Sequence, residues 1–161
     1  MRLIAFDKNG TATLGARDGD SVVDLSIAAP DLPGDLTGVI KLGQAGIDKI
    51  AAAVSNAGDD ARVSLDGIKY LPPSTNAGKL ICLGLNYADH AAEGGHNKPE
   101  YPSFFLRTNS TLVAHGDPIV RPVVSEQLDY EAEMVAIVGK QARHVKREDA
   151  LDYIWGYSVF N

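Results

Sequence analysis

Residues 128–139, LDYEAEMVAIVG, set three acids at alternate positions and then continue into an apolar run. Side chains alternate between the two faces of a β-strand, so the pattern predicts a long strand with Asp129, Glu131 and Glu133 on one face. From residue 134 onward both faces carry mainly apolar side chains, which is typical of a strand buried on both sides. The stretch therefore predicts a β-rich core with acids gathered at the start of one strand.

Acids that point in one direction repel one another, and this repulsion needs an explanation. Same-face neighbours on a strand lie about 6–7 Å apart. At an effective dielectric constant of about 20, two carboxylates at that distance repel by about 2–3 kcal/mol. Water at a sheet edge would lower this cost, and so would a divalent cation between the acids; an all-oxygen ligand set favours Mg²⁺, Mn²⁺ or Ca²⁺ over zinc. The alternative is an exposed strand end whose acids face water.

Composition and charge exclude several classes of partner. The chain has 161 residues, of which 45% are hydrophobic, and it carries a net charge of −6. An acidic protein is poorly suited to nucleic acid or to an anionic membrane as its main partner. The sequence contains no apolar run near the ~20 residues that span a bilayer, and it begins without the apolar core of a secretory signal. We therefore expect a cytoplasmic protein with a small-molecule partner.

The first 75 residues are expected to form a small α+β module. The segments MRLIAF (1–6) and TATLGAR (11–17) predict a hairpin, because Asn9-Gly10 is a strong type I′ turn signal. No cluster of histidine, cysteine or acidic residues points to chemistry in the module. The other elements expected there are a strand at 21–26, a loop at 28–38, a helix at 47–58 and a strand pair within 62–73 that turns at Asp66-Gly67.

A stretch of turn-forming residues, PPSTNAG (72–78), marks the expected boundary with a second domain over 76–161. Residues 157–161, YSVFN, read as a strand that enters a core, whereas natural domains usually finish at the surface with polar residues. We therefore expect the sequence to be a fragment of a longer protein. The other elements expected in this domain are strands at 79–87, 103–108 and 128–140 and helices at 87–95 and 147–157.

A histidine and an acid are three residues apart in NYADHAAEGG, at His90 and Glu93. On a helix they share a face. A carboxylate beside an imidazole fixes its tautomer and raises its basicity, as a general base requires. The glycines that follow begin a flexible loop that could close over a site. The alternative is a solvent-facing pair on a surface helix.

Four motifs occur in the order of a known family. Together they closely resemble the fumarylacetoacetate hydrolase family over residues 79–161, and the first module resembles the small N-terminal domain of many bacterial members. The resemblance implies an α+β, β-rich fold in which the N-terminal α+β module is followed by the first part of the family's mixed β-roll. The motifs are KLICLGLNYADHAAE (79–93), PSFFLRTNSTLVAHGDPIVRP (102–122), LDYEAEMVAIVGK (128–140) and EDALDYIWGYSVFN (148–161).

The resemblance also implies an activity and its residues. Members use Mg²⁺ or Mn²⁺, and this chain is expected to be a metal-dependent hydrolase that cleaves a carbon–carbon bond in a β-diketo acid or acylpyruvate-type substrate, as in aromatic compound catabolism. Glu131 and Glu133 match the metal ligands, and His90 and Glu93 match the catalytic pair that acts on water. Arg107 stands where the family usually has lysine, and we expect it to bind a substrate carboxylate.

Alternative interpretations stay open. The family's third metal ligand is an aspartate directly after the asparagine that matches Asn161, so the chain is alternatively a catalytically incomplete fragment. Relatives with similar chemistry act as 2-oxo acid decarboxylases or isomerases, and an unrelated acidic binding module is a third interpretation. We expect a 2-oxo or diketo acid as the substrate, no nucleic-acid or membrane partner, and a homodimer or larger homo-oligomer, since family members are commonly dimers.

Overall fold

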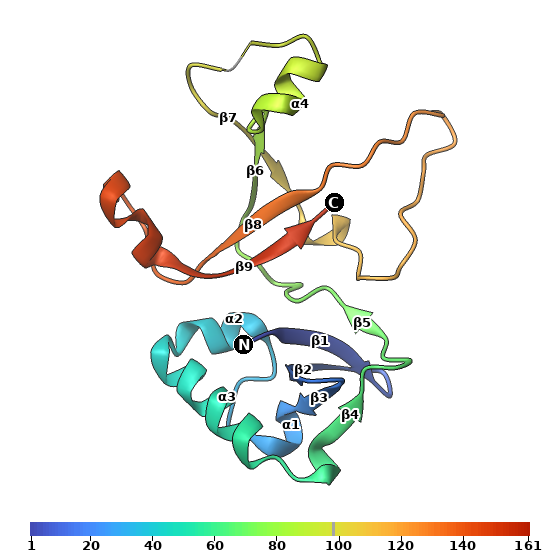
Figure 1. Ribbon diagram of the computed structural model, residues 1–161, viewed down its shortest axis with the longest axis vertical. Helices are drawn as coiled ribbons and strands as arrows, with labels where there is room; N and C mark the ends of the chain where they lie inside the picture. The colour runs from blue at the N-terminus through green and yellow to red at the C-terminus, as the bar shows by residue number, and fades with distance from the viewer. Residues whose placement is uncertain (98) are drawn as a thin grey trace. The chain divides into compact units, whose positions relative to one another are not determined.

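The structure is a computed structural model that describes residues 1–97 and 99–161. The chain divides into two compact units, of which the first comprises Met1–Ser74 with Val113–Asn161 and the second comprises Thr75–Leu112. Figure 1 shows the elements of each unit. The predicted division into two domains at residue 75 stays a prediction. None of the described helices is long and apolar enough to cross a membrane.

The first unit contains a five-stranded antiparallel sheet in the order β4-β3-β2-β1-β5 (Figure 1). Its first two strands form the predicted hairpin, with Lys8 opposite Thr11. Asn9 and Gly10 have φ angles of 54° and 85°, as a type I′ turn requires. The strands are β1 (Leu3–Lys8), β2 (Thr11–Asp18), β3 (Ser21–Asp24), β4 (Arg62–Ser64) and β5 (Tyr70–Leu71).

The strand pair predicted within residues 62–73 is wrong in its pairing. Both strands form and Gly67 makes a turn with φ of 75°, but β4 and β5 lie at opposite edges of the sheet. β4 pairs with β3 and β5 pairs with β1. A local turn signal identifies where the chain bends, but it carries no information about which distant strand offers the free edge.

Three helices come between β3 and β4 in the sequence: α1 (Leu25–Ala28), α2 (Leu36–Lys41) and α3 (Gln44–Asn56). The predicted helix at 47–58 is confirmed as α3, with an earlier start. The loop predicted over 28–38 ends early, because Asp35 caps α2 by accepting a hydrogen bond from the backbone N–H of Gly38 at 2.9 Å. A short 3₁₀ helix, η1 (Asp59–Ala61), leads into β4.

The hydrophobic core of the first unit lies between these helices and the sheet (Figure 1). Val39 of α2 and Ile50 of α3 have no exposed surface. The side chains of Ile137 and Trp155 pack against the same cluster at its margin. The buried cluster consists of Leu14, Ala16, Leu25, Leu32, Leu36, Val39, Ile50 and Ala53.

The rest of the first unit is a two-stranded ribbon of β8 (Glu133–Val138) and β9 (Ile154–Phe160), preceded by the 3₁₀ helix η3 (Arg147–Tyr153). The predicted strand over 128–140 is thus shorter, since β8 begins at Glu133. The prediction that this strand is buried on both faces is wrong, because Met134 is 68% exposed. The helix predicted over 147–157 is a 3₁₀ helix that ends at Tyr153.

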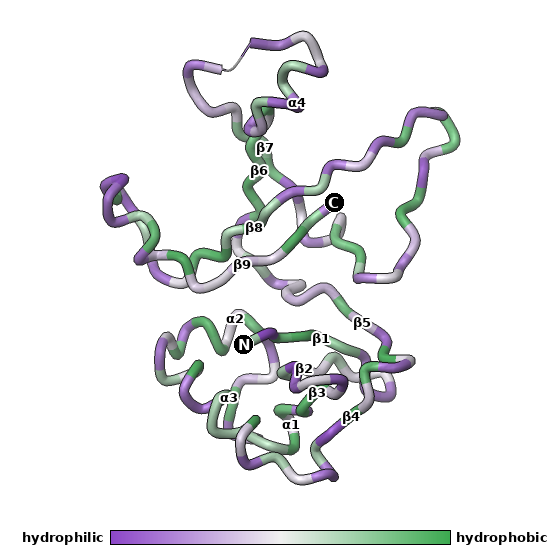
Figure 2. The backbone as a smooth tube through the Cα atoms, in the orientation of Figure 1, coloured by the Kyte–Doolittle hydropathy of each residue, from purple (hydrophilic) through white to green (hydrophobic). Residues whose placement is uncertain are grey.

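The second unit is built on the antiparallel pair of β6 (Leu80–Gly84) and β7 (Ser103–Arg107), joined through helix α4 (Ala88–Glu93). All three elements were predicted. Figure 2 colours both strands largely as hydrophobic, yet every side chain of β7 is exposed. A 3₁₀ turn, η2 (Asn109–Thr111), follows, and the side-chain amide of Asn109 donates to the carbonyl of Ala77 at 2.9 Å.

The carboxylate of Asp24 is a buried charge that connects the sheet to the helices. It accepts a hydrogen bond from Nζ of Lys8 at 2.5 Å and from the backbone N–H of Ser26 at 2.8 Å. Burial raises the pKa of Asp24, but the hydrogen bonds from Lys8 and Ser26 outweigh it, so the pKa lies below its usual 3.8. The charged form of Asp24 therefore stabilises the fold.

Replacing Asp24 with Asn should lower the free energy of unfolding at neutral pH by about 1–3 kcal/mol, because charge-assisted hydrogen bonds are lost. A carboxyl whose pKa is depressed in the folded state stabilises fully above its unfolded value of 3.8, and this stabilisation disappears as the pH falls through the folded value. As the pH falls from above 3.8 through the folded value, the Asn variant should therefore lose less stability than the wild type. Denaturant titrations at a series of acid pH values measure both effects.

The exposed carboxyl of Asp31 offers a matched control. Asp31→Asn should leave both the neutral stability and its acid dependence close to wild type. If Asp24→Asn loses stability on acidification as steeply as the wild type, the role assigned to this carboxylate is wrong.

Candidate active site

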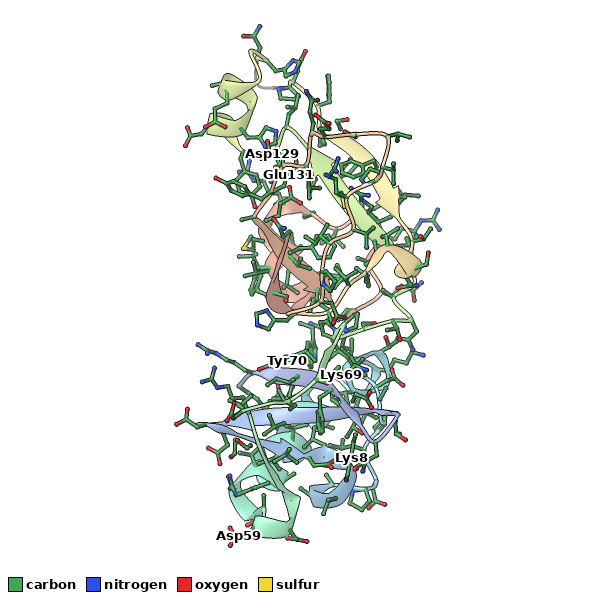
Figure 3. The ribbon with its side chains drawn as sticks, turned by 90° about the vertical axis from the view of Figure 1, so that its right-hand side faces the viewer. Lys8, Asp59, Lys69, Tyr70, Asp129 and Glu131 are labelled. Atoms are coloured by element: carbon green, nitrogen blue, oxygen red, sulfur yellow. The ribbon has the colours of Figure 1, made fainter. Side chains whose placement is uncertain are left out.

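Two of the predicted acids, Asp129 and Glu131, lie in the segment that leads into β8 (Figure 3). Glu133 is the first residue of the strand, is half-buried, and lies opposite Phe160. Glu131 precedes the strand and is exposed. Its backbone N–H donates to Oδ1 of Asn161 at 3.0 Å. The two predicted metal ligands are thus two residues apart at the open end of a strand pair.

Asp129 lies in an irregular segment before the strand. Its Oδ1 accepts a hydrogen bond from the N–H of Tyr130 at 2.9 Å, and its side chain is exposed. The alternation that placed three acids on one strand face therefore fails before Glu133, because residues 128–132 do not form a strand. A period of two in the sequence occurs in irregular segments as well as in strands, so the pattern alone could not separate them.

The donor chemistry of Glu131 and Glu133 fits a hard divalent cation. Both offer carboxylate oxygens, which Mg²⁺, Mn²⁺ and Ca²⁺ prefer. Glu131 is exposed and Glu133 half-buried, so neither charge is sealed from water. Within residues 1–97 and 99–161, no group of three or more histidine, cysteine, aspartate or glutamate side chains gathers to hold a metal ion. Glu131 and Glu133 thus stay predicted ligands, of the kind that a hard cation takes.

Two apolar residues hold the β8–β9 ribbon against the core of the first unit. Ile137 of β8 and Trp155 of β9 pack at the margin of the buried cluster. Gly139, just after β8, lies against Trp155, and its backbone N–H donates to the carbonyl of Tyr153 at 2.8 Å. A Cβ on Gly139 would come within 2.6 Å of the Cβ of Trp155. The ribbon that carries Glu133 therefore depends on a residue without a side chain at this position.

The predicted catalytic pair lies on α4 in the second unit. Ala91 is the buried residue of this helix, whereas His90 and Glu93 are exposed. Their spacing of three places them on the same side of the helix. The helix ends at Gly94, and Gly95 follows with a φ of 71°, which a residue with a side chain adopts only with strain.

Arg107 ends β7, where it lies opposite Leu80 of β6. Its guanidinium carbon lies 5.6 Å from the centre of the Phe105 ring, a cation–π distance that restricts the orientation of the side chain. The side chain is exposed, so its charge is available to an anionic ligand. A planar guanidinium binds a carboxylate through two parallel hydrogen bonds, which a lysine cannot make.

The five predicted site residues are therefore divided between the two units. His90, Glu93 and Arg107 belong to the second unit. Glu131 and Glu133 belong to the first. The role of each stays a prediction.

The comparison with protein families establishes which family the chain belongs to. The family description "Fumarylacetoacetate (FAA) hydrolase C-terminal" matches residues 79–161. The chain belongs to the fumarylacetoacetate hydrolase family. The match covers α4, both strand pairs and all five predicted site residues, so the resemblance read from the four motifs is confirmed.

Similar members of the fumarylacetoacetate hydrolase family include enzymes with several reactions in their names. The mitochondrial oxaloacetate tautomerase fahd2 of Xenopus laevis is 32% identical over 99% of this chain and 50% of its own length. The homoprotocatechuate catabolism bifunctional isomerase/decarboxylase of Escherichia coli is 50% identical over 52% of this chain and 20% of its own length. The chain spans about half the length of the first of these relatives.

Solved structures of the family confirm the predicted fold class. The maleylpyruvate hydrolase of Sphingobium sp. SYK-6, determined with manganese(II) and pyruvate, is 28% identical and has a TM-score of 0.76 over 99% of this chain and 57% of its own. The fold is α+β and rich in sheet, as in other structures of the fumarylacetoacetate hydrolase family.

Sequence reasoning missed two residues that shape the site. The sequence pattern identified Gly139 only as the end of a strand. Its close approach to Trp155 depends on packing that no local pattern encodes. Asn161 entered only as a position in a motif, yet its side chain binds the backbone of Glu131. A usable signal existed for Gly139, since a glycine at a strand end indicates a close backbone approach.

Replacing Gly139 with Ala should destabilise the protein by about 1–3 kcal/mol, since the new methyl group would overlap the Cβ of Trp155 and force the ribbon to shift. Thermal or denaturant unfolding measures the loss.

Gly156→Ala is the matched control, because Gly156 lies in the same ribbon and a Cβ there meets no atom within 4 Å. The control should stay within about 0.5 kcal/mol of wild type, as surface substitutions usually do. Equal stabilities for the two variants would show that the contact with Trp155 does not prevent a side chain at position 139.

Proposed function

We propose that the protein is a divalent-metal-dependent hydrolase that cleaves a carbon–carbon bond in a β-diketo acid or acylpyruvate-type substrate. The observation that carries the proposal is the likeness over 99% of this chain to a maleylpyruvate hydrolase whose structure holds manganese(II) and pyruvate. The carboxylate donors of this chain favour Mg²⁺ or Mn²⁺, with Ca²⁺ as a further hard cation.

Glu131 and Glu133 would hold the cation through carboxylate oxygens. A bound divalent cation would supply Lewis acidity toward the 1,3-dicarbonyl or 2-oxo acid unit of the substrate. Arg107 would pair with the substrate carboxylate through its exposed guanidinium, and the stacked Phe105 ring would limit how far that group turns.

His90 would act as the general base. Its imidazole would take a proton from water, and the resulting hydroxide would attack the carbonyl carbon. The carbon–carbon bond would then break, its electron pair would move into the enolate of the departing fragment, and the proton on His90 would return to that carbon. Glu93, on the same side of α4, would stabilise the imidazolium formed in between. The net reaction consumes one water and releases a carboxylic acid and a ketone.

A second candidate is enolisation of a 2-oxo acid without bond cleavage. The oxaloacetate tautomerase of Xenopus laevis is 32% identical over nearly all of this chain, which specifically favours this candidate. Proton removal from carbon and its return need the same base and the same stabilisation of an enolate, but no attack by water. Substrate assays therefore separate the two candidates.

Glu133→Gln should weaken Mn²⁺ binding by more than about tenfold, because one of two anionic ligands becomes neutral. His90→Ala should leave Mn²⁺ binding near wild type and lower kcat for acylpyruvate hydrolysis by about 10²–10⁴-fold, the usual contribution of a general base. Calorimetry with Mn²⁺ and the loss of substrate absorbance measure the two effects on the purified protein.

The exposed His96 provides a control, and His96→Ala should retain both binding and hydrolysis. Hydrolysis that survives His90→Ala would remove this residue from the mechanism. Rapid keto–enol exchange of oxaloacetate without any acylpyruvate hydrolysis would overturn the hydrolase and establish the second candidate.

We also propose that the protein forms a homodimer or larger homo-oligomer. Phe104 and Leu106 of β7 are 62% and 73% exposed, and apolar side chains at that exposure favour association. Light scattering should therefore give a mass of at least two chains at micromolar concentration. A mass of one chain across that range would contradict the proposal.

A further inference from the structure

The pairing of β8 with β9 ends at Glu133, two residues before Glu131. Glu133 opposite Phe160 is the last pair of the ladder on this side. One further step in the register would bring Ala132 opposite Asn161, but residues 128–132 are not strand. Beyond the last pair, the side chain of Asn161 makes the connection, because its Oδ1 accepts the backbone N–H of Glu131 at 3.0 Å.

This hydrogen bond fixes the main chain of a residue that no strand holds. Glu131 is exposed and lies in an irregular segment, where the backbone N–H of the neighbouring Tyr130 donates to Oδ1 of the adjacent Asp129. Without an anchor, such a segment samples many backbone conformations, and a ligand that needs one of them must order it. The anchor comes from a residue thirty positions later, at the end of the partner strand.

An asparagine suits this position chemically. Its side-chain carbonyl accepts the N–H of Glu131, yet it brings no negative charge toward two carboxylates that already repel each other. An aspartate would make the same hydrogen bond and add a charge. A leucine has a similar size but offers no acceptor.

We propose that Asn161 is a positioning residue of the metal site: its Oδ1 holds the main chain of Glu131 so that the carboxylates of Glu131 and Glu133 are presented together. This inference rests on the proposed metal-binding function. Asn161 itself is assigned no contact with the cation. Residues that orient metal ligands in this way typically contribute about 10–100-fold to metal affinity.

The test compares the purified wild type with Asn161→Ala, Asn161→Asp and Asn161→Leu. The first readout is hydrogen exchange of the Glu131 amide in metal-free protein, measured by NMR. The second is the dissociation constant for Mn²⁺ alone. Val159→Ala is the control, because Val159 lies near the end of the same strand with 79% of its surface exposed.

Asn161→Ala and Asn161→Leu should each speed exchange at Glu131 by more than about tenfold and weaken Mn²⁺ binding by about 10–100-fold. Exchange at Val135, inside the ladder, should stay unchanged. Asn161→Asp should keep slow exchange at Glu131 and should bind Mn²⁺ at least as tightly as wild type. If one of the two variants without an acceptor fails to fold, the other carries the comparison.

The outcomes separate this inference from the function on which it rests. If the wild type binds Mn²⁺ and Asn161→Ala or Asn161→Leu binds it equally well, the positioning role is overturned while the proposed function stands. If the wild type binds no Mn²⁺, the proposed function fails. A purely structural role would lower the unfolding midpoint and speed exchange along the whole strand, including Val135, which also contradicts the proposal.

Discussion

The pairing of β8 with β9 is the constraint on which the acidic site depends. It places Glu133 at the start of one strand and Asn161 just beyond the end of the other, so two residues far apart in sequence flank the same open end of the ribbon. The ribbon in turn is held by Ile137 and Trp155, which pack at the margin of the core of the first unit. The site is thereby coupled to the stability of the N-terminal module.

The position of the acids at the end of the ladder reconciles two opposing demands. Carboxylates that bind a cation, as proposed for Glu131 and Glu133, must stay charged, which burial would oppose. They must also be held in place, which exposure and irregular backbone oppose. Glu133 is ordered by the strand, and the side chain of Asn161 accepts a hydrogen bond from the backbone of Glu131, while both acids stay accessible to water. Asp129 is not part of this pair of acids, because its side chain accepts a hydrogen bond from the backbone of Tyr130.

Sequence reasoning succeeded wherever the signal was local or carried by several motifs together. The Asn9-Gly10 turn specifies its own hairpin, and four ordered motifs were enough to identify the family. Sequence reasoning failed where the local structure depends on a strand or residue far away in the sequence. The segment at residues 62–73 contains two strands and a turn, yet its strands join opposite edges of the sheet. The hydrogen bond between Glu131 and Asn161 likewise follows from a strand register that no window of sequence reveals.

The placement of β5 has a consequence for how the protein is made. β1 is the first strand that the structure describes, and among the described residues β5 is its neighbour on the edge away from β2, through pairs such as Phe6 with Tyr70. During synthesis that edge stays open until Tyr70 has left the ribosome, long after the first hairpin has emerged. Pairing β5 with β1 closes a long loop, which costs conformational entropy and slows the formation of this pair. A nascent chain therefore carries this edge of β1 unpaired through most of the module's translation, and an unpaired edge can pair with other chains.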